Sequence, residues 1–509
     1  MNIMIFLEMA AQTAPDRVAI GNLDGGLTYG RLYELAGGLA TQLRAKESAR
    51  LLYSDEATPS LPVSLFGASW AGVPFVPVNY RLADDRLRTL IGKQAPALHA
   101  HNATAVARIA GIEGVEEITT DNLVTLAESS EAAEADWSFE GDDVAILLHT
   151  SGTSGDPKVA VLRQRHLVSY VLGSVDFLSA EEHEATLVSV PPYHIAGMSA
   201  ILTATYGGRR LVQLPTFDAR VWVETAKRER ITHAMVVPTM MARILEVLEE
   251  TWESLPDLQH LSYGGGRMPV PVITQAMGLL PHVNFVNAYG LTETSSSVSV
   301  LDPDDHRVAM DSDDPDIRAR LGSVGRPLPT IELSIRDLDG QEVPQGERGE
   351  VWVRGEQVSG EYGGISVLNA DGWFPTKDAG YLDVDNYLFL EGRMDDVIVR
   401  GGENLSPGEI EDVLLQHPAI RDAAVLGVPD TEWGEAVAAV VVLQEGAELS
   451  GDEVKDWVAK HLRSSRRPNR VEFRSELPHN DTGKLLRRVI KAELIATQPE
   501  PETDESGLS

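Results

Sequence analysis

The sequence predicts an α/β protein in which a hinge joins two domains. We expect a large N-terminal domain with mixed, largely parallel sheets packed with helices and a small β-rich subdomain, followed by a small C-terminal α+β domain. Three observations predict this fold class. Strands alternate with helical segments from about residue 143, short strands dominate after residue 305, and a helix-start signal at Ser406 opens a second pattern of helices and strands. At 509 residues the chain exceeds what one core usually serves.

The N-terminal elements come first. Residues 1–17 predict an amphipathic helix rather than a signal peptide, because no basic residue precedes the short apolar run and Glu8 interrupts it. Thr28 is expected to cap a helix within residues 27–46, whose apolar residues recur at helical spacing. Residues 50–53 and 74–78 are predicted to be short buried strands around a helix at 60–72.

Strands and helices then alternate. Residues 165–178 are predicted to be a helix, and residues 301–316 a solvated acidic loop. The predicted strands of this part are 143–149, 159–162, 186–190, 233–238, 258–265 and 283–290, followed by 331–337, 349–355 and 386–392 in the β-rich segment.

The C-terminal part begins after a predicted linker. Ser406 and Glu409 form a capping-box pattern, and Pro407 stands at the first helical position. We expect strands at 422–429 and 437–443, a helix at 452–462, and a disordered acidic tail. The expected domain ranges are 1–392 for the large domain, 393–396 for the hinge, 397–496 for the small domain and 497–509 for the tail.

Composition limits the classes of function. The net charge is −34, from 77 acidic and 43 basic residues, and such a field repels nucleic acid and anionic membranes. The absence of cysteine excludes disulfides, thiolate metal sites and Cys nucleophiles, and fits a cytoplasmic protein. No uninterrupted apolar stretch is long enough to span a bilayer. Neither nucleic acid nor a membrane span is therefore expected, and the oligomeric state stays open, with a homodimer among the options.

A loop between two predicted strands carries the first functional signal. It is rich in small and hydroxyl residues, which let backbone N–H groups approach an anion, and Lys158 adds a positive charge. A Walker phosphate loop needs Gly-Lys-Ser/Thr before a helix, and this loop has neither feature. The alternative interpretation is an ordinary hairpin loop. If the loop binds phosphate, the candidate ligands are Thr150, Ser151, Gly152, Thr153, Ser154, Gly155 and Lys158.

This loop resembles the phosphate-binding loop of the adenylate-forming (AMP-binding) enzymes, the family of acyl- and aryl-CoA synthetases, peptide-synthetase adenylation domains and luciferases. Four further stretches resemble the motifs of that family in the same order, at residues 287–294, 371–396, 400–414 and 477–488. The resemblance implies a mobile small domain, with ATP and Mg²⁺ as cofactors and CoA as co-substrate.

The resemblance also implies roles for single residues. Lys484 would bridge the attacking carboxylate and the α-phosphate, Thr292 would contact phosphate, and Glu293 would hold Mg²⁺. Asp378 and Arg393 would bind the ribose hydroxyls, and Asp395 would be the hinge residue. Tyr289 would stack on adenine. The other expected nucleotide-binding positions are Gly264, Gly265, Gly266, Asn287, Ala288 and Gly290. Ordinary structural roles remain open for these residues: a helix-start carboxylate, a buried aromatic ring and an exposed ion pair.

The remaining implied positions concern the acid and the thiol. His194, Met198 and Met268 would line the acyl pocket, although His194 could equally be a core histidine. Gly401, Gly402 and Glu403 would form the passage for the pantetheine arm of CoA. The resemblance thus implies an acyl-CoA synthetase that activates a small-molecule carboxylic acid. A carrier-protein-loading adenylating enzyme and a non-catalytic nucleotide-binding protein are the alternatives.

Three features depart from the family pattern. Lys377 stands where the family usually has Gly before the ribose-binding aspartate, and His479 replaces an arginine in the terminal motif. The stretch 360–371 is shorter than usual and lacks the Tyr-Trp word of the family. The first two could tune nucleotide or CoA affinity, and the third could reshape the cleft between the domains.

Overall fold

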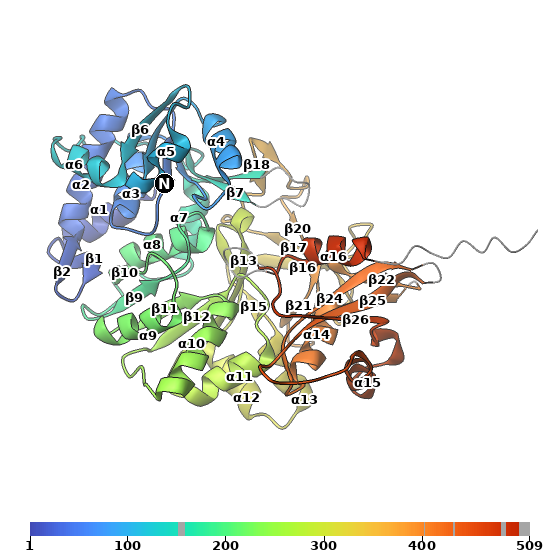
Figure 1. The fold of residues 1–509 in the computed structure, drawn as a ribbon. Coiled ribbons are helices and arrows are strands. Elements are labelled where there is room, and N and C mark those ends of the chain that lie inside the picture. Colours follow the sequence, from blue (N-terminus) through green and yellow to red (C-terminus); the bar gives the residue numbers. More distant parts are fainter. Residues whose placement is uncertain (151–157, 402, 431–432, 480–484, 498–509) are drawn as a thin grey trace, which may run out of the picture.

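The computed structural model describes residues 1–150, 158–401, 403–430, 433–479 and 485–497. In these residues the structure has four β-sheets with helices packed against them (Figure 1). The predicted fold class is confirmed: a large N-terminal part holds two mixed sheets and a smaller antiparallel one, and a small α+β part follows at the C-terminus.

The largest sheet formed by the described residues has nine strands in the order β15-β14-β13-β12-β11-β9-β10-β1-β2. Its central neighbours run parallel, and β2, β14 and β15 pair antiparallel at the two ends. The strands are β1 (Val18–Asn22), β2 (Gly25–Thr28), β9 (Ala185–Val188), β10 (Arg210–Gln213), β11 (His233–Val236), β12 (His260–Gly264), β13 (Asn284–Leu291), β14 (Ser296–Leu301) and β15 (Arg326–Pro327). The helices in this part of the chain are α7 (Gln164–Leu172), α8 (Ile195–Gly207), α9 (Ala219–Arg228), α10 (Pro238–Thr251), α11 (Val270–Leu279), α12 (Pro303–Asp311) and α13 (Pro315–Ala319).

A second sheet has eight strands among the described residues, in the order β19-β18-β8-β7-β4-β3-β5-β6. The strands are β3 (Leu51–Ser54), β4 (Phe75–Pro77), β5 (Ala97–His101), β6 (Val115–Thr119), β7 (Val144–Thr150), β8 (Lys158–Arg163), β18 (Glu361–Tyr362) and β19 (Ile365–Ser366). The accompanying helices are α1 (Met4–Thr13), α2 (Tyr29–Ala45), α3 (Ser60–Ala71), α4 (Asp84–Gly92), α5 (Val106–Ile109) and α6 (Thr120–Glu128). Thr28 caps α2 as expected, because its side chain accepts a hydrogen bond from the Arg31 N–H.

Two smaller sheets complete the described structure. The antiparallel β-rich sheet contains β16 (Glu332–Arg336), β17 (Gly349–Arg354), β20 (Phe374–Leu382) and β21 (Leu388–Arg393). The C-terminal sheet contains β22 (Ile398–Arg400), β23 (Glu403–Leu405), β24 (Ile420–Asp430), β25 (Gly434–Leu443) and β26 (Arg470–Arg474), with α14 (Pro407–Leu415), α15 (Gly451–His461) and α16 (Arg487–Ala496). Short 3₁₀ turns are η1 (Ala103–Ala105), η2 (Thr292–Thr294), η3 (Arg320–Gly322), η4 (Met394–Asp396) and η5 (Ser464–Arg466).

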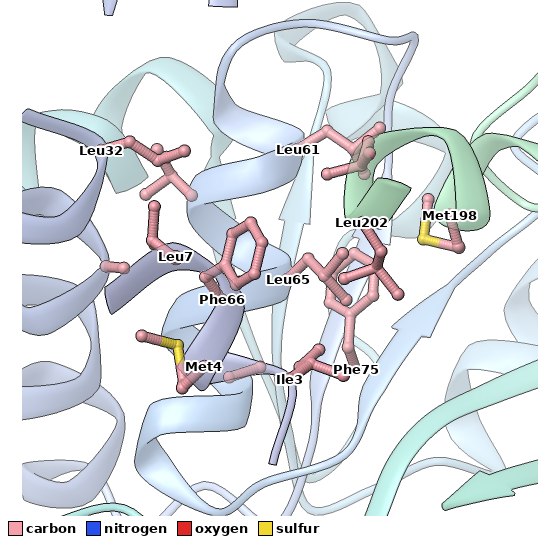
Figure 2. Packing of buried hydrophobic residues seen from close by; sticks show 14 of the residues in the cluster. Ile3, Met4, Leu7, Leu32, Leu61, Leu65, Phe66, Phe75, Met198 and Leu202 are labelled. Atoms are coloured by element: carbon pink, nitrogen blue, oxygen red, sulfur yellow. The ribbon is translucent and has the colours of Figure 1, made fainter. Parts of the chain in front are cut away.

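The main core of the large domain joins its two mixed sheets through shared helices. Figure 2 shows side chains of α1, α3 and α8 packed together with Phe75 of β4. Met4, Leu7, Phe66 and Leu202 are each fully buried there. Burying such a side chain contributes about 1.5–3 kcal/mol, so α1 is a structural part of the domain. No helix built by the described residues combines the length and the apolar character needed to cross a membrane.

One secondary-structure prediction was wrong, and two others were only partly right. The stretch 301–316 is mostly helical, in α12 and α13, because Asp302 and Asp314 each cap a helix that begins with proline and His306 is buried against Tyr263. The predicted helix 165–178 ends at Leu172, where Gly173 caps it. Only half of the predicted capping box at Ser406 is present: its hydroxyl accepts from the Glu409 N–H, and it donates to the Glu391 carbonyl.

A buried histidine lies in the middle of β5. His99 has no exposed surface, and its Nε2 lies 2.6 Å from Ser54 Oγ. Burial, with a smaller contribution from nearby His101, lowers the pKa of His99 from 6.5 to about 3. The ring is therefore neutral in the folded protein at neutral pH.

Lys377 adopts a left-handed backbone conformation, with φ of 65°. This explains why glycine is usual at the corresponding position, because a side chain in this region costs about 1–2 kcal/mol. Its N–H donates to Glu350 Oε1 at 3.0 Å, and its ammonium lies 3.4 Å from the same oxygen. The lysine side chain is 60% exposed, so this ion pair offsets little of the strain.

We expect acid to destabilise the protein through His99. Between its folded pKa of about 3 and the ordinary value of 6.5, the unfolded chain binds the extra proton, so the free energy of unfolding falls as the pH falls. From pH 7 to pH 5 this group should remove roughly 2 kcal/mol. Denaturant unfolding of the natural protein and of His99→Gln at both pH values measures the effect. Equal losses in the two proteins would show that His99 does not carry it.

Lys377→Gly should raise the free energy of unfolding by about 1 kcal/mol, because glycine adopts positive φ without a steric penalty and keeps the N–H bond to Glu350. Lys377→Ala is the matched control, since it loses the same ammonium but keeps the strained backbone. Denaturant unfolding of the three proteins compares them. If the Gly variant is no more stable than the Ala variant, the strain is not stored at this residue.

Candidate active site

The candidate site lies where β13 of the large sheet meets β20 and β21 of the β-rich sheet. Tyr289 on β13 donates its hydroxyl proton to Asp378 Oδ2 at 2.6 Å. Arg393 donates from Nη1 to Asp378 Oδ1 at 3.1 Å and to the Thr376 carbonyl at 3.0 Å. Asp378 and Arg393 are direct cross-strand partners in the register of β20 and β21. Antiparallel pairing therefore brings these two residues together, although fourteen residues separate them in the sequence.

Electrostatics keep the Tyr289 hydroxyl protonated. Burial and the Asp378 carboxylate raise the pKa of Tyr289 well above its usual value, so its hydroxyl stays a donor. The side chain of Asp378 is 14% exposed and that of Arg393 is 31% exposed. The carboxylate can accept hydrogen bonds from two vicinal hydroxyl groups, and the guanidinium beside it can donate one to them.

A second group surrounds Glu293 in η2. Its carboxylate accepts a hydrogen bond from the Tyr362 hydroxyl, and its backbone carbonyl accepts from the Ser359 N–H at 2.8 Å. Glu293 is 7% exposed. The Lys158 ammonium lies 5.2 Å from the centre of the Tyr362 ring, within range of a cation–π interaction. Tyr362 therefore contacts both a buried carboxylate in η2 and the cation that begins β8.

The two groups are electrostatic neighbours. Burial and Glu293 raise the pKa of Tyr362, and the charge of Arg393 opposes that rise. Tyr362 also pairs with Ala160 of β8, so the second sheet reaches the site through β18. The site is thus assembled from all three sheets of the large domain.

Tyr362 is the functional candidate that sequence reasoning missed. It lies in the short stretch 360–371, which was treated only as a departure from the family pattern. A tyrosine between an acidic residue and two glycines was the available signal, but its contact with Glu293, 69 positions earlier, exists only in the fold.

Several expected glycines have packing reasons of their own. A Cβ on Gly264 would lie 2.3 Å from the Ala288 carbonyl oxygen, and one on Gly290 would lie 1.9 Å from that of Ser296. Gly265 has φ of 76°, whereas a Cβ on Gly266 would make only ordinary contact with Pro238. Close strand packing therefore explains Gly264 and Gly290 without a ligand.

The other expected nucleotide-binding residues lie along the same elements. Asn287 is buried and donates from Nδ2 to the Ser323 carbonyl at 2.9 Å. Ala288 and Thr292 are half-buried, on β13 and in η2. Thr150, at the end of β7, donates from Oγ1 to the Lys158 carbonyl at 3.3 Å. Five predicted phosphate ligands, Ser151, Gly152, Thr153, Ser154 and Gly155, lie outside the described residues.

The three expected acyl-pocket residues lie in different surroundings. Met198 lies in the main core near Leu202 (Figure 2), and Met268 belongs to a separate hydrophobic cluster. His194 precedes α8, with its ring 4.7 Å from that of Tyr193. Core packing accounts for the two methionines, and their role in an acyl pocket stays a prediction.

The C-terminal candidates lie near the start of the small sheet. Asp395 is exposed in η4, between β21 of one sheet and β22 of another. Gly401 has φ of 59°, and a Cβ there would lie 2.8 Å from the Trp433 ring. Glu403 forms an ion pair with Arg466. Gly402 and Lys484 lie outside the described residues.

Comparison with known proteins identifies the family. The chain matches the family described as "AMP-binding enzyme" over residues 7–363 and the one described as "AMP-binding enzyme C-terminal domain" over residues 409–484. It is 30% identical to a feruloyl-CoA synthase of Amycolatopsis sp, with 94% of this chain and 96% of the relative covered. It is also 30% identical to the fatty acid–[acyl-carrier-protein] ligase ScoC of Streptomyces coeruleorubidus, with 94% of each chain covered.

Solved structures agree with this assignment. The O-succinylbenzoate CoA synthetase of Bacillus subtilis in complex with its acyl-adenylate intermediate has a TM-score of 0.82 and 28% identity, with 96% of this chain and 97% of that chain covered. The same synthetase in complex with ATP and a magnesium ion has a TM-score of 0.81 and 28% identity, with 95% and 98% covered. The chain therefore belongs to the family of AMP-binding enzymes, as its motifs predicted.

Proposed function

We propose that this protein is an AMP-forming acid–CoA ligase. In the first half-reaction a carboxylate oxygen attacks the α-phosphorus of ATP, and the bond to pyrophosphate breaks, which leaves an acyl adenylate. In the second, the thiol of CoA attacks the acyl carbon, its proton is released, and the bond to AMP breaks to give a thioester. The similarity to a feruloyl-CoA synthase and to an O-succinylbenzoate CoA synthetase over nearly the whole chain supports this reaction.

The joint presence of the two groups at one site carries the proposal. A carboxylate–guanidinium pair, Asp378 and Arg393, suits a ribose, and the group around Glu293 and Lys158 suits the phosphates. Both groups belong to neighbouring elements and share the electrostatic influence of Arg393. A nucleoside phosphate bound across them would therefore meet hydrogen-bond acceptors at its sugar and positive charge at its anionic end.

Glu293 fits a role in holding Mg²⁺. The ion usually takes one or two protein carboxylates and completes its shell with phosphate oxygens and water. Glu293 supplies one buried carboxylate, and no group of three acidic or histidine ligands occurs in the described part of the chain. When bound, Mg²⁺ would neutralise charge on the phosphates. Tyr362 holds the carboxylate in place by donating its hydroxyl proton to it.

Lys484 is proposed as the catalytic lysine of the first half-reaction. Two anions must approach each other, and negative charge accumulates on the phosphate in the transition state. An ammonium between them lowers the repulsion and orients the attack. Asp395, exposed between two sheets, is proposed as the hinge about which the small domain withdraws Lys484 for the second half-reaction.

A carrier protein is the second candidate for the thiol acceptor. The similarity to a fatty acid–[acyl-carrier-protein] ligase at 30% identity favours keeping this option. Both acceptors present a thiol, so the first half-reaction is the same and only the second distinguishes them.

Pyrophosphate release across a panel of fatty, aryl and alicyclic acids, with and without CoA, tests the function. We expect a subset of acids to release pyrophosphate, and AMP to appear together with thioester only when CoA is present. AMP and thioester formation only with a phosphopantetheinylated carrier protein would select the alternative acceptor. Absence of pyrophosphate release with every acid would overturn the proposed reaction.

Lys484→Ala should abolish acyl-adenylate formation while sparing thioester formation from a supplied acyl adenylate, because only the first step brings two anions together. A fall of about 10²-fold or more in pyrophosphate release is expected on loss of such a charge. Each half-reaction is measured separately, and Lys491→Ala in the same C-terminal region is the control. Equal losses in the two half-reactions would contradict the assigned role.

A further inference from the structure

Arg267 lies between the candidate nucleotide site and the small domain. It directly follows the Gly264–Gly266 loop, and its guanidinium forms an ion pair with Asp412 on α14 of the small domain. The two side chains are 37% and 25% exposed. A positively charged side chain from the loop after β12 therefore contacts α14, the first α-helix of the small domain.

Gly408 makes room for this contact. A Cβ at this position would lie 2.3 Å from Arg267 Nη1 and 2.9 Å from Cζ. The guanidinium therefore rests against the first turn of α14, where the N-terminal end of the helix carries partial positive charge. That end repels a cation, and the ion pair with the Asp412 carboxylate offsets this repulsion.

Two further contacts near this ion pair are also polar. On the large-domain side Arg348 pairs with Glu391 of β21 at 2.9 Å, and the Glu391 carbonyl accepts a hydrogen bond from the Ser406 hydroxyl at 3.1 Å. Burial raises the pKa of Glu391, and the charges of Arg348 and Arg267 oppose that rise. Polar interfaces between domains are typical of parts that move relative to each other.

We propose that Arg267 is a positioning residue whose ion pair with Asp412 holds the small domain in the orientation seen in this structure. The inference rests on the proposed function, because two half-reactions performed by one site need two placements of the small domain. A pair that exists in one placement and breaks in the other sets the equilibrium between them. Arg267 directly follows Gly264–Gly266, which are expected to bind the nucleotide. Its ion pair with Asp412 therefore links that loop to the placement of the small domain.

Breaking the Arg267–Asp412 pair should lower the population of this domain orientation. Burial raises the pKa of Asp412, and Arg267 is the main influence that opposes it. Without the guanidinium, the partly buried carboxylate is better solvated in any orientation that exposes it. Coupling between two contacting charged residues corresponds to a change of roughly tenfold in an equilibrium, and we expect the population of this orientation to fall by about that factor.

A distance measurement tests the orientation without requiring catalysis. The chain has no cysteine, so Glu246→Cys on α10 and Ala459→Cys on α15, both exposed, allow specific labelling of the two domains. The distance distribution between the labels, measured by pulsed electron paramagnetic resonance, reports how much of the protein has the orientation described here.

Three variants and one control test whether the ion pair itself determines the distance distribution. Asp412→Asn should reduce the population of this orientation, and Gly408→Ala should do so by displacing the guanidinium with both charges intact. The charge-reversed double variant Arg267→Asp with Asp412→Arg should restore part of it. Arg220→Gln, which removes an exposed ion pair with Glu250 in the large domain, should leave the distribution unchanged. An unchanged distribution in Asp412→Asn and Gly408→Ala would overturn the proposal.

The two half-reactions provide an independent readout. In Asp412→Asn the ratio of their rates should change by several-fold, with one half-reaction faster and the other slower, whereas a general loss of folding would slow both. Equal slowing of both with an unchanged distance distribution counts against a positioning role. Absence of both reactions in the natural protein would overturn the ligase function, and the distance measurement would still decide whether Arg267 holds the domain.

Discussion

The Asp378 carboxylate is the point on which the arrangement of the large domain and its site depends. One oxygen accepts from Tyr289 of the nine-stranded sheet and the other from Arg393 of the β-rich sheet. The bond from Tyr289 therefore ties the two sheets together, and both bonds fix the direction in which the carboxylate points. Arg393 is also the last residue of β21, directly before η4. The proposed ribose-binding arginine and the start of the candidate hinge are thus adjacent in the chain.

The site contains positively charged side chains although the whole molecule is strongly acidic. The net charge is −34, which would slow the approach of an anionic substrate at long range. Lys158 and Arg393 nevertheless lie at the site, against the Tyr362 ring and the Asp378 carboxylate. Short-range hydrogen bonds and partly buried cations can bind an anion despite an unfavourable long-range field, because they are less screened by water.

The shortened stretch 360–371 shows how far motif reasoning extends. Seen as sequence, it was a departure from the family pattern that put the cleft in doubt. In the fold it supplies β18, which joins the second sheet through Ala160, and Tyr362, which orients Glu293. Likewise the acidic run after Leu301 looked like a solvated loop, although its Asp-Pro pairs are helix-start signals. Helix caps were readable there, but the burial of His306 against Tyr263 was not.

The sequence by itself determined the family, the α/β fold class, most strands of the large domain and the identity of the charged residues at the site. These depend on periodicity, caps and short motifs, which are local along the chain. Only the tertiary structure decided which of these residues meet. Tyr289 contacts Asp378, Tyr362 contacts Glu293, and Arg267 contacts Asp412, although 89, 69 and 145 positions of sequence separate the partners. Such pairs follow from sheet register and domain packing, which bring together residues that no local pattern relates.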